Sequence, residues 1–287
     1  MSALRILLTN DDGIHTKGLE VAETIARALT DDVWVVAPET EQSGASHSLT
    51  LARPLRMREI DNRHFAVTGT PTDCVMMATT HLMKDAQPTL VLSGVNRGVN
   101  AADDVTYSGT IAGAMEGCAL DIPSIALSQA YNFEEKREVQ WACAETHGPV
   151  LIRKLIEIGW PKDVLINVNF PDCPSDEVKG VEIVAQGKRD LQEAVIDKRI
   201  DMRGYPYFWI GFRRERVSAK PGTDLGALYA KKISVTPLQL NLTETTVMET
   251  LKKQIDSTLL LRVEGDQRSP AGHSQPDSRT AKPFGEG

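Results

Sequence analysis

Short apolar runs alternate with helix-type patterns between residues 6 and 168 of this 287-residue chain. Each run is three to five mostly apolar residues long, as expected of a strand that is buried on both faces. The segments between the runs repeat apolar residues at spacings of three and four, which is typical of a helix with one buried face. The alternation therefore predicts an α/β fold, in which helices cover both sides of a Rossmann-like, doubly wound, mostly parallel sheet. We expect strands at 6–8, 33–37, 89–92, 124–127 and 164–168, and helices near 19–29, 72–83, 109–120 and 138–158.

The pattern changes over residues 180–220. Here β-type runs at 181–184 and 205–210 are interrupted by basic residues and turn formers. We interpret this segment as a β-rich C-terminal arm or hairpin extension of the main domain. Arms of this kind often form contacts between subunits.

The chain then returns to a strand at 233–236 and a helix that begins near residue 243. Residues 264–287 are rich in Gly, Pro, Ser and charged residues, and Phe284 is their only large apolar residue. This segment cannot bury enough apolar surface to offset the entropy lost on ordering, so we expect a disordered tail. The α/β domain is therefore predicted to span residues 1–263.

Composition excludes several classes of protein. The 32 Lys and Arg residues against 39 Asp and Glu residues give a net charge of −7, which repels a phosphate backbone. We therefore expect no binding to nucleic-acid duplexes. The four cysteines form no C-x-x-C pair, so neither a zinc knuckle nor a thioredoxin-like motif is indicated. No apolar run reaches the roughly 18–20 residues that span a bilayer, and the N-terminus lacks a signal-peptide layout, so we expect a cytoplasmic protein without membrane contact.

Three predicted strands lead into polar, oxygen-rich segments. The strand at 6–8 is followed by Asp11 and Asp12, and two other strands lead into the loops 39–46 and 93–100. Sites in open α/β sheets lie beyond the carboxyl ends of the strands, so these segments are expected to converge. Carboxylate, hydroxyl and amide oxygens favour Mg²⁺, Mn²⁺ or Ca²⁺ over Zn²⁺. An isolated Asp-Asp-Gly is more often only a turn, but the two further oxygen-rich strand ends favour a metal site.

A phosphate site is indicated at the start of the predicted helix 109–120, where the sequence reads Ser108-Gly109-Thr110. Free backbone N–H groups, two hydroxyls and the positive end of the helix dipole make such a position suited to an anion. The alternative is that Ser108 only caps the helix, which needs one hydroxyl. A cap does not require the small Gly109 beside it, so we favour the phosphate site.

Other common nucleotide and hydrolase motifs are missing from the sequence. The first strand is not followed by G-x-G-x-x-G, which argues against dinucleotide binding, and the chain has no G-x-x-x-x-G-K-[ST] phosphate loop. It also has no G-x-S-x-G elbow, so the chemistry of α/β-hydrolases is not indicated. The six histidines show no metal-ligand spacing and are interpreted as structural residues.

An ordered set of short segments resembles the SurE survival-protein family, a resemblance that covers roughly residues 4–260. The segments are Ile6–Gly13, the loop from Ala37-Pro38 to Gln42-Ser43-Gly44, Val67–Val75, Ser93–Asn100, Tyr107–Thr110, Asn167–Pro171 and Ser234–Leu238.

The resemblance implies a phosphatase that uses a divalent metal and acts on nucleoside monophosphates at the 5′ or 3′ position. It implies one cation per subunit, Mg²⁺ or Mn²⁺, and a homodimer or homotetramer. The metal ligands it implies are Asp11, Asp12, Ser43 and Asn96. The residues it places around the phosphate are Asn100, Ser108, Gly109 and Thr110. We take Asp11, Asp12, Asn100 and Ser108 as the candidate catalytic residues.

Two other functions compete with this one. A haloacid-dehalogenase-type phosphatase uses an aspartyl nucleophile two residues before a second Asp, whereas here Asp11 and Asp12 are adjacent. A non-catalytic sensor that binds Mg²⁺ and a nucleotide without turnover has the same sequence requirements. Only an assay for released phosphate separates this sensor from an enzyme.

Overall fold

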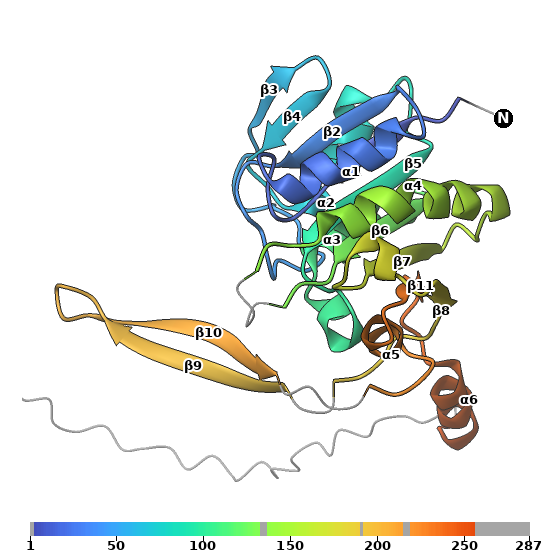
Figure 1. Ribbon diagram of the computed structural model, residues 1–287. Coiled ribbons are helices and arrows are strands. Elements are labelled where there is room, and N and C mark those ends of the chain that lie inside the picture. The colour runs from blue at the N-terminus through green and yellow to red at the C-terminus, as the bar shows by residue number, and fades with distance from the viewer. Residues whose placement is uncertain (1–2, 133–136, 190–191, 215–218, 256–287) are drawn as a thin grey trace, which may run out of the picture. The chain divides into compact units, whose positions relative to one another are not determined.

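The computed structural model describes residues 3–132, 137–189, 192–214 and 219–255 of the chain. Its centre is a nine-stranded sheet (Figure 1). In spatial order the strands are β3 (Met57–Asp61), β4 (His64–Val67), β2 (Val33–Pro38), β1 (Ile6–Thr9), β5 (Leu90–Arg97), β6 (Ser124–Gln129), β7 (Val164–Phe170), β11 (Ile233–Gln239) and β8 (Val181–Ile183). The pairings from β4 across to β7 are all parallel, whereas β3 is antiparallel to β4 and β11 is antiparallel to β7. The predicted mostly parallel α/β sheet is thereby confirmed.

Helices cover both faces of the sheet (Figure 1). They are α1 (Lys17–Arg27) and α4 (Trp141–Ile158) on one face, and α2 (Pro71–Met77) and α3 (Gly109–Ala119) on the other. Alternate residues of a strand point to opposite faces. Accordingly, Ile6 and Leu8 of β1 are buried in the core beneath α1, whereas Leu7 is buried in the core beneath α2. Because both faces of the sheet are covered, these strands are mostly apolar. This is why they appear in the sequence as short apolar runs between helix-type segments.

Several elements were not predicted from the sequence. The edge strand β3 is exposed and reads Met-Arg-Glu-Ile-Asp, so it has no continuous apolar run. The short helix α5 (Asp224–Tyr229) has only six residues, too few to show a period. The run at 181–184 forms β8, which pairs with β11 at the edge of the central sheet and so is not part of the arm predicted over residues 180–220. The hairpin itself consists of β9 (Gln192–Ile200) and β10 (Pro206–Arg214).

The described residues 243–255 belong to a unit of their own, apart from the unit that contains residues 3–242. They contain helix α6 (Thr245–Gln254), close to the start expected near residue 243. The predicted disordered tail, residues 264–287, lies outside the described residues. All four cysteines are buried and unpaired.

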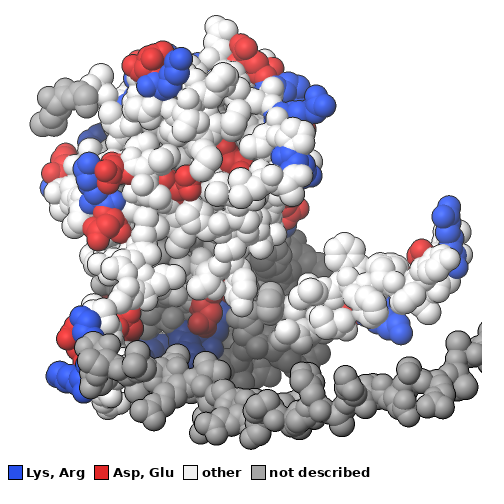
Figure 2. Space-filling model, turned by 180° about the vertical axis from the view of Figure 1, so that it is seen from behind, with Lys and Arg blue, Asp and Glu red and all other residues white. Residues whose placement is uncertain are grey.

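Charged side chains of both signs are interspersed over the face shown in Figure 2, without a continuous basic area among the described residues. This distribution agrees with the net charge of −7. No helix in the described part of the chain has the length and apolar character needed to cross a membrane.

Candidate active site

Asn10 shapes the turn that follows β1. Its side-chain Nδ2 donates to the Gly13 carbonyl oxygen at 2.9 Å, and its Oδ1 accepts from the Gly13 N–H at 3.3 Å. Gly13 has a φ of +111°, which residues with a Cβ rarely adopt. The segment is therefore a tight turn, as the alternative interpretation held. Because Asn10 makes the turn, the side chains of Asp11 and Asp12 remain available at the carboxyl end of β1.

Asp11 is buried against the N-terminus of α3. The Thr110 hydroxyl donates to its Oδ1 at 2.5 Å. A Cβ on Gly109 would lie 2.7 Å from the Asp11 Cβ, so this approach requires glycine. Burial raises the pKa of Asp11, although the Thr110 hydroxyl and the backbone N–H groups of Gly109 and Thr110 partly lower it. The close packing of Asp11 thus gives Gly109 a structural reason that the sequence did not reveal.

Asp12 is partly buried next to Asp11. Burial raises its pKa to about 6, and the negative charges of Asp11 and Glu41 act in the same direction. The Arg97 backbone N–H donates to its Oδ2 at 3.2 Å and opposes the shift. Two adjacent carboxyl groups with raised pKa values are the arrangement that a bound cation would relieve.

The loop 39–46 is held against Asp11 through its backbone. The Gln42 N–H donates to the Asp11 carbonyl oxygen at 2.7 Å, which brings the next residue, Ser43, to the site. The Ser43 hydroxyl donates to Glu41 Oε1 at 2.9 Å. Its oxygen keeps lone pairs for a further interaction, because a hydroxyl accepts as well as donates.

Two asparagines of the predicted site lie at the end of β5 or just after it. Asn96 lies near the end of the strand, and its Nδ2 donates to the Gly98 carbonyl oxygen at 3.0 Å. The amide oxygen of Asn96 is therefore the atom suited to a cation. Asn100 lies three residues beyond β5 and is 6% exposed.

Ser108 is the N-cap of α3, as its capping interpretation predicted. Its Oγ accepts from the Ile111 N–H at 3.0 Å. The side chain is 7% exposed and lines the cavity described next. A cap and a phosphate contact are therefore compatible at this residue, and the phosphate contact stays a prediction.

One open cavity, of about 970 Å³, joins these side chains. Six of the eight predicted site residues line it, namely Asp11, Asp12, Ser43, Asn96, Asn100 and Ser108. Gly109 and Thr110 are buried and are not among the lining residues. The Thr110 hydroxyl is directed to Asp11, so this side chain orients a predicted metal ligand.

Three aromatic side chains also line the cavity. Tyr107, Tyr131 and Trp141 line it, and the Arg97 guanidinium lies 5.0 Å from the Tyr131 ring centroid. Tyr107 and Tyr131 lie in loops and Trp141 begins α4, and single aromatic residues so far apart in the sequence have no spacing that signals a site. Glu41 was detectable, because it belongs to the oxygen-rich loop 39–46.

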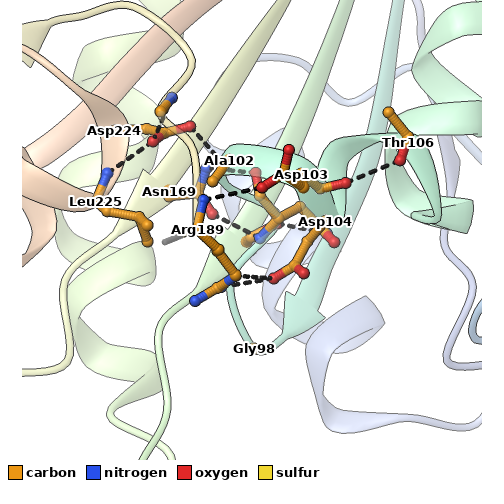
Figure 3. A network of polar contacts seen from close by, with 12 residues as sticks. Gly98, Ala102, Asp103, Asp104, Thr106, Asn169, Arg189, Asp224 and Leu225 are labelled. Carbon is orange, nitrogen blue, oxygen red and sulfur yellow. Dashed lines mark hydrogen bonds and ion pairs between the residues drawn. The ribbon is translucent and has the colours of Figure 1, made fainter. Parts of the chain in front are cut away.

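The segment between β5 and α3 is held by a polar network (Figure 3). Arg189 Nη2 and Nε both donate to Asp104 Oδ2, at 2.6 and 3.1 Å, and the Arg189 N–H donates to Asp103 Oδ2 at 2.8 Å. The fully buried Asp224 accepts from the Ala102 N–H at 2.8 Å. Arg189 precedes the β9–β10 hairpin and Asp224 follows it, so residues flanking both ends of the hairpin fix the segment that carries Asn100.

The donor chemistry of the site restricts the kind of metal that fits it. In the described residues, no group of three or more His, Cys, Asp or Glu side chains is arranged to hold an ion. The site instead combines the Asp11 and Asp12 carboxylates with hydroxyl and amide oxygens. Such an all-oxygen set suits Mg²⁺ or Mn²⁺ and does not suit Zn²⁺.

Comparison with known proteins identifies relatives of this chain. The family model described as "Survival protein SurE" matches residues 6–193. The chain is 60% identical to "5′-nucleotidase SurE" of Methylorubrum extorquens (strain PA1), over 84% of this chain and 95% of that protein. It is 58% identical to the protein of the same name from Rhodopseudomonas palustris (strain HaA2), over 88% and 100%. The crystal structure of the SurE protein from Aquifex aeolicus superimposes with a TM-score of 0.76 at 39% identity, covering 88% of this chain and all of that one. The chain belongs to the SurE family.

Proposed function

We propose that this protein is a metal-dependent phosphomonoesterase that hydrolyses nucleoside 5′-monophosphates, and also 3′-monophosphates, to nucleoside and phosphate. The observation that carries the proposal is the adjacent pair Asp11 and Asp12, which have raised pKa values and line one cavity together with other oxygen donors. The relatives named 5′-nucleotidase SurE support the same reaction.

The cofactor in this proposal is one divalent cation per subunit, Mg²⁺ or Mn²⁺. Its ligands would be Asp11, Asp12, Ser43 and Asn96, which all line the cavity and offer only oxygen atoms. When bound, such an ion supplies Lewis-acid polarisation of a phosphoryl oxygen and lowers the pKa of water. Thr110 and the backbone of α3 keep Asp11 in the orientation that the site requires.

The phosphate in this proposal is held by Asn100 and Ser108, which line the cavity alongside the carboxylates. Phosphoryl transfer depends on positioning and charge stabilisation more than on covalent chemistry. Preorganised donors at the transferred group contribute to both. The contribution of Gly109 and Thr110 to phosphate binding stays a prediction, since neither residue lines the cavity and their backbone N–H groups are directed at the Asp11 carboxylate.

The competing function is a sensor that binds a nucleotide and a metal without turnover. The test is phosphate release from a panel of nucleoside 5′- and 3′-monophosphates with Mg²⁺ or Mn²⁺, before and after EDTA. We expect turnover that EDTA abolishes and that added metal restores. Nucleotide binding without released phosphate would identify a sensor, and full turnover after exhaustive chelation would refute the metal.

We also propose that the protein is a homodimer or homotetramer and that the β-rich arm within residues 180–220 of a domain at 1–263 forms subunit contacts. Ile196, Phe208 and Ile210 of the hairpin are all more than half exposed, which supports this role. The cytoplasmic location stays a prediction from the sequence.

A further inference from the structure

Two asparagines are buried on one face of β7, in the interior of the central sheet. Asn167 and Asn169 are both 0% exposed. They are two residues apart on a strand and so lie on the same face. A buried amide costs free energy unless its polar atoms find hydrogen-bond partners, so a pair of them within an apolar sheet calls for a physical reason.

Both asparagines are directed at the main chain of Asn100. Asn167 Nδ2 and Asn169 Nδ2 donate to the Asn100 carbonyl oxygen at 2.8 and 3.1 Å. The Asn100 N–H donates to Asn169 Oδ1 at 2.9 Å. The two amides are also joined to each other, since Asn169 Nδ2 lies 3.3 Å from Asn167 Oδ1. Asn169 is labelled beside the segment that carries Asn100 in Figure 3.

These contacts take the place of strand pairing. Asn100 lies beyond the end of β5 at Arg97, where the described neighbouring strands no longer bond to its backbone. Its N–H and C=O groups nevertheless both have partners, and both partners are side chains of β7. A residue held by side chains of a rigid strand is placed more accurately than a residue held by a flexible loop.

The side chain of Asn100 is held from the same sheet. Its Nδ2 donates to Ser128 Oγ on β6 at 2.9 Å, and Ser128 is fully buried. An amide nitrogen carries two protons, so one N–H remains for the cavity after the bond to Ser128 is made. The backbone and the side chain of Asn100 are thus fixed by three residues that do not line the cavity.

We propose that Asn167 and Asn169 are positioning residues, which hold Asn100 where its amide contacts the phosphate of the substrate. The proposal rests on the proposed function and deepens it. It assigns a role to the Asn167-Val168-Asn169 segment of β7, which neither the metal site nor the phosphate site uses directly.

The first test compares Asn169→Ala with the wild-type protein. Misplacement of Asn100 is expected to lower kcat/KM for a nucleoside monophosphate on the order of 10–100-fold and to weaken binding of inorganic phosphate in calorimetry. The affinity for Mn²⁺, titrated in the same way, is expected to stay at the wild-type value, because no predicted metal ligand contacts Asn169. The matched control is Ser234→Ala. Ser234 of β11 pairs directly with Asn169 of β7 and is equally buried, and its hydroxyl makes no hydrogen bond in the described structure.

The second test is a double-mutant cycle with Asn100→Ala. If Asn169 acts through Asn100, then Asn169→Ala has no further effect on kcat/KM or on phosphate binding once Asn100 is alanine. Equal losses in both backgrounds would overturn the proposal, as would unchanged phosphate binding in folded Asn169→Ala. Where Asn169→Ala does not fold, Asn167→Ser removes the one bond that Asn167 donates to the Asn100 carbonyl oxygen and serves the same cycle.

The design separates this proposal from the proposed function. A wild-type protein that releases no phosphate from any nucleotide refutes the activity. The phosphate-binding arm of the cycle still decides whether Asn169 positions Asn100.

Discussion

Three influences act in the same direction on the carboxyl group of Asp12. Burial, the charge of Asp11 and the charge of Glu41 all raise its pKa, which reaches about 6 in the folded protein against 3.8 ordinarily. A carboxyl group with a raised folded-state pKa destabilises the fold once it ionises. The metal-free protein is therefore expected to lose stability as pH rises from about 4 to about 6, where the folded protein retains a proton that the unfolded chain releases.

Asp12→Asn is expected to abolish turnover and yet stabilise the metal-free protein at pH 7. Removing one of two adjacent buried charges should raise the free energy of unfolding by about 1–3 kcal/mol. Urea unfolding in EDTA at pH 4 and pH 7 measures this gain, which should be confined to the higher pH. Asp85→Asn changes an exposed carboxylate and is the control. A variant less stable than wild type at pH 7 would contradict the conclusion that the ionised Asp12 carboxylate destabilises the metal-free fold.

At this scale, the sequence identified residues better than it identified their contacts. Asp11, Asp12 and Ser43 were predictable because they follow strands whose carboxyl ends meet at one edge of the sheet. The direction of the Thr110 hydroxyl was not predictable, since it depends on how closely α3 approaches β1. The close approach of α3 to β1 also requires a glycine at position 109, for which the sequence indicated only a role in phosphate binding.

Among the elements, His64 links β4 to α1. Its Nε2 lies 3.1 Å from Glu23 of α1, and its Nδ1 lies 2.8 Å from Asp61 at the end of β3. Partial burial lowers the pKa of His64, but the hydrogen bonds to Asp61 and Glu23 outweigh this effect and raise the pKa above 6.5. Protonated His64 therefore stabilises the folded protein. This stabilisation is complete below pH 6.5 and is lost as pH rises through the higher folded-state pKa of His64.

His64→Gln tests this linkage between elements. The difference in unfolding free energy between wild type and variant is expected to be largest near pH 6 and to shrink toward pH 8. The carboxylates of Glu23 and Asp61 have pKa values below their usual ones, so they do not titrate in this interval. Parallel stability curves from pH 6 to pH 8 would show that His64 contributes no charge-dependent stabilisation.

The ion pair between Arg189 and Asp104 holds the segment before α3 from the base of the hairpin. Its side chains are only 12% and 10% exposed. Arg189→Leu leaves a buried carboxylate without this partner and is expected to cost about 3–5 kcal/mol of unfolding free energy. Adding Asp104→Asn should recover part of that loss. Arg199→Leu breaks an exposed pair with Asp197, with side chains 58% and 51% exposed, and is expected to cost less than about 1 kcal/mol. Equal losses in the two Arg variants would refute a structural role for the buried pair.

Elements were predictable where burial on two faces made a strand wholly apolar or where a helix showed one apolar stripe. The exposed edge strand β3 and the six-residue helix α5 satisfy neither condition, so their sequences resemble loops. The run at 181–184 was recognised as a strand, but its partner was not. Pairing of β8 with β11 joins residues about 50 positions apart, and no local pattern carries that information.

For the whole molecule, the hairpin β9–β10 raises the question of what covers it. Direct cross-strand partners lie on the same face, so the pairs Ile196–Ile210 and Lys198–Phe208 put three large apolar side chains on one side. These three side chains are 56–73% exposed. An isolated two-stranded hairpin is marginally stable in water, and an exposed apolar stripe of this kind marks a contact surface. A second copy of the chain is the partner that fits the proposed homo-oligomer.

The double variant Phe208→Ser/Ile210→Ser is therefore expected to reduce the mass of the particle in light scattering at micromolar concentration. It should leave the circular dichroism of the α/β body unchanged, because neither side chain belongs to the core clusters of the central sheet. The control is Arg199→Ser, which pairs with Tyr207 on the opposite face of the same hairpin. An unchanged mass in the double variant would place subunit contacts elsewhere. A monomer that keeps full turnover would show that the arm serves assembly alone. A monomer with weakened phosphate binding would indicate that subunit contacts also support the site, through the network of Arg189 and Asp224.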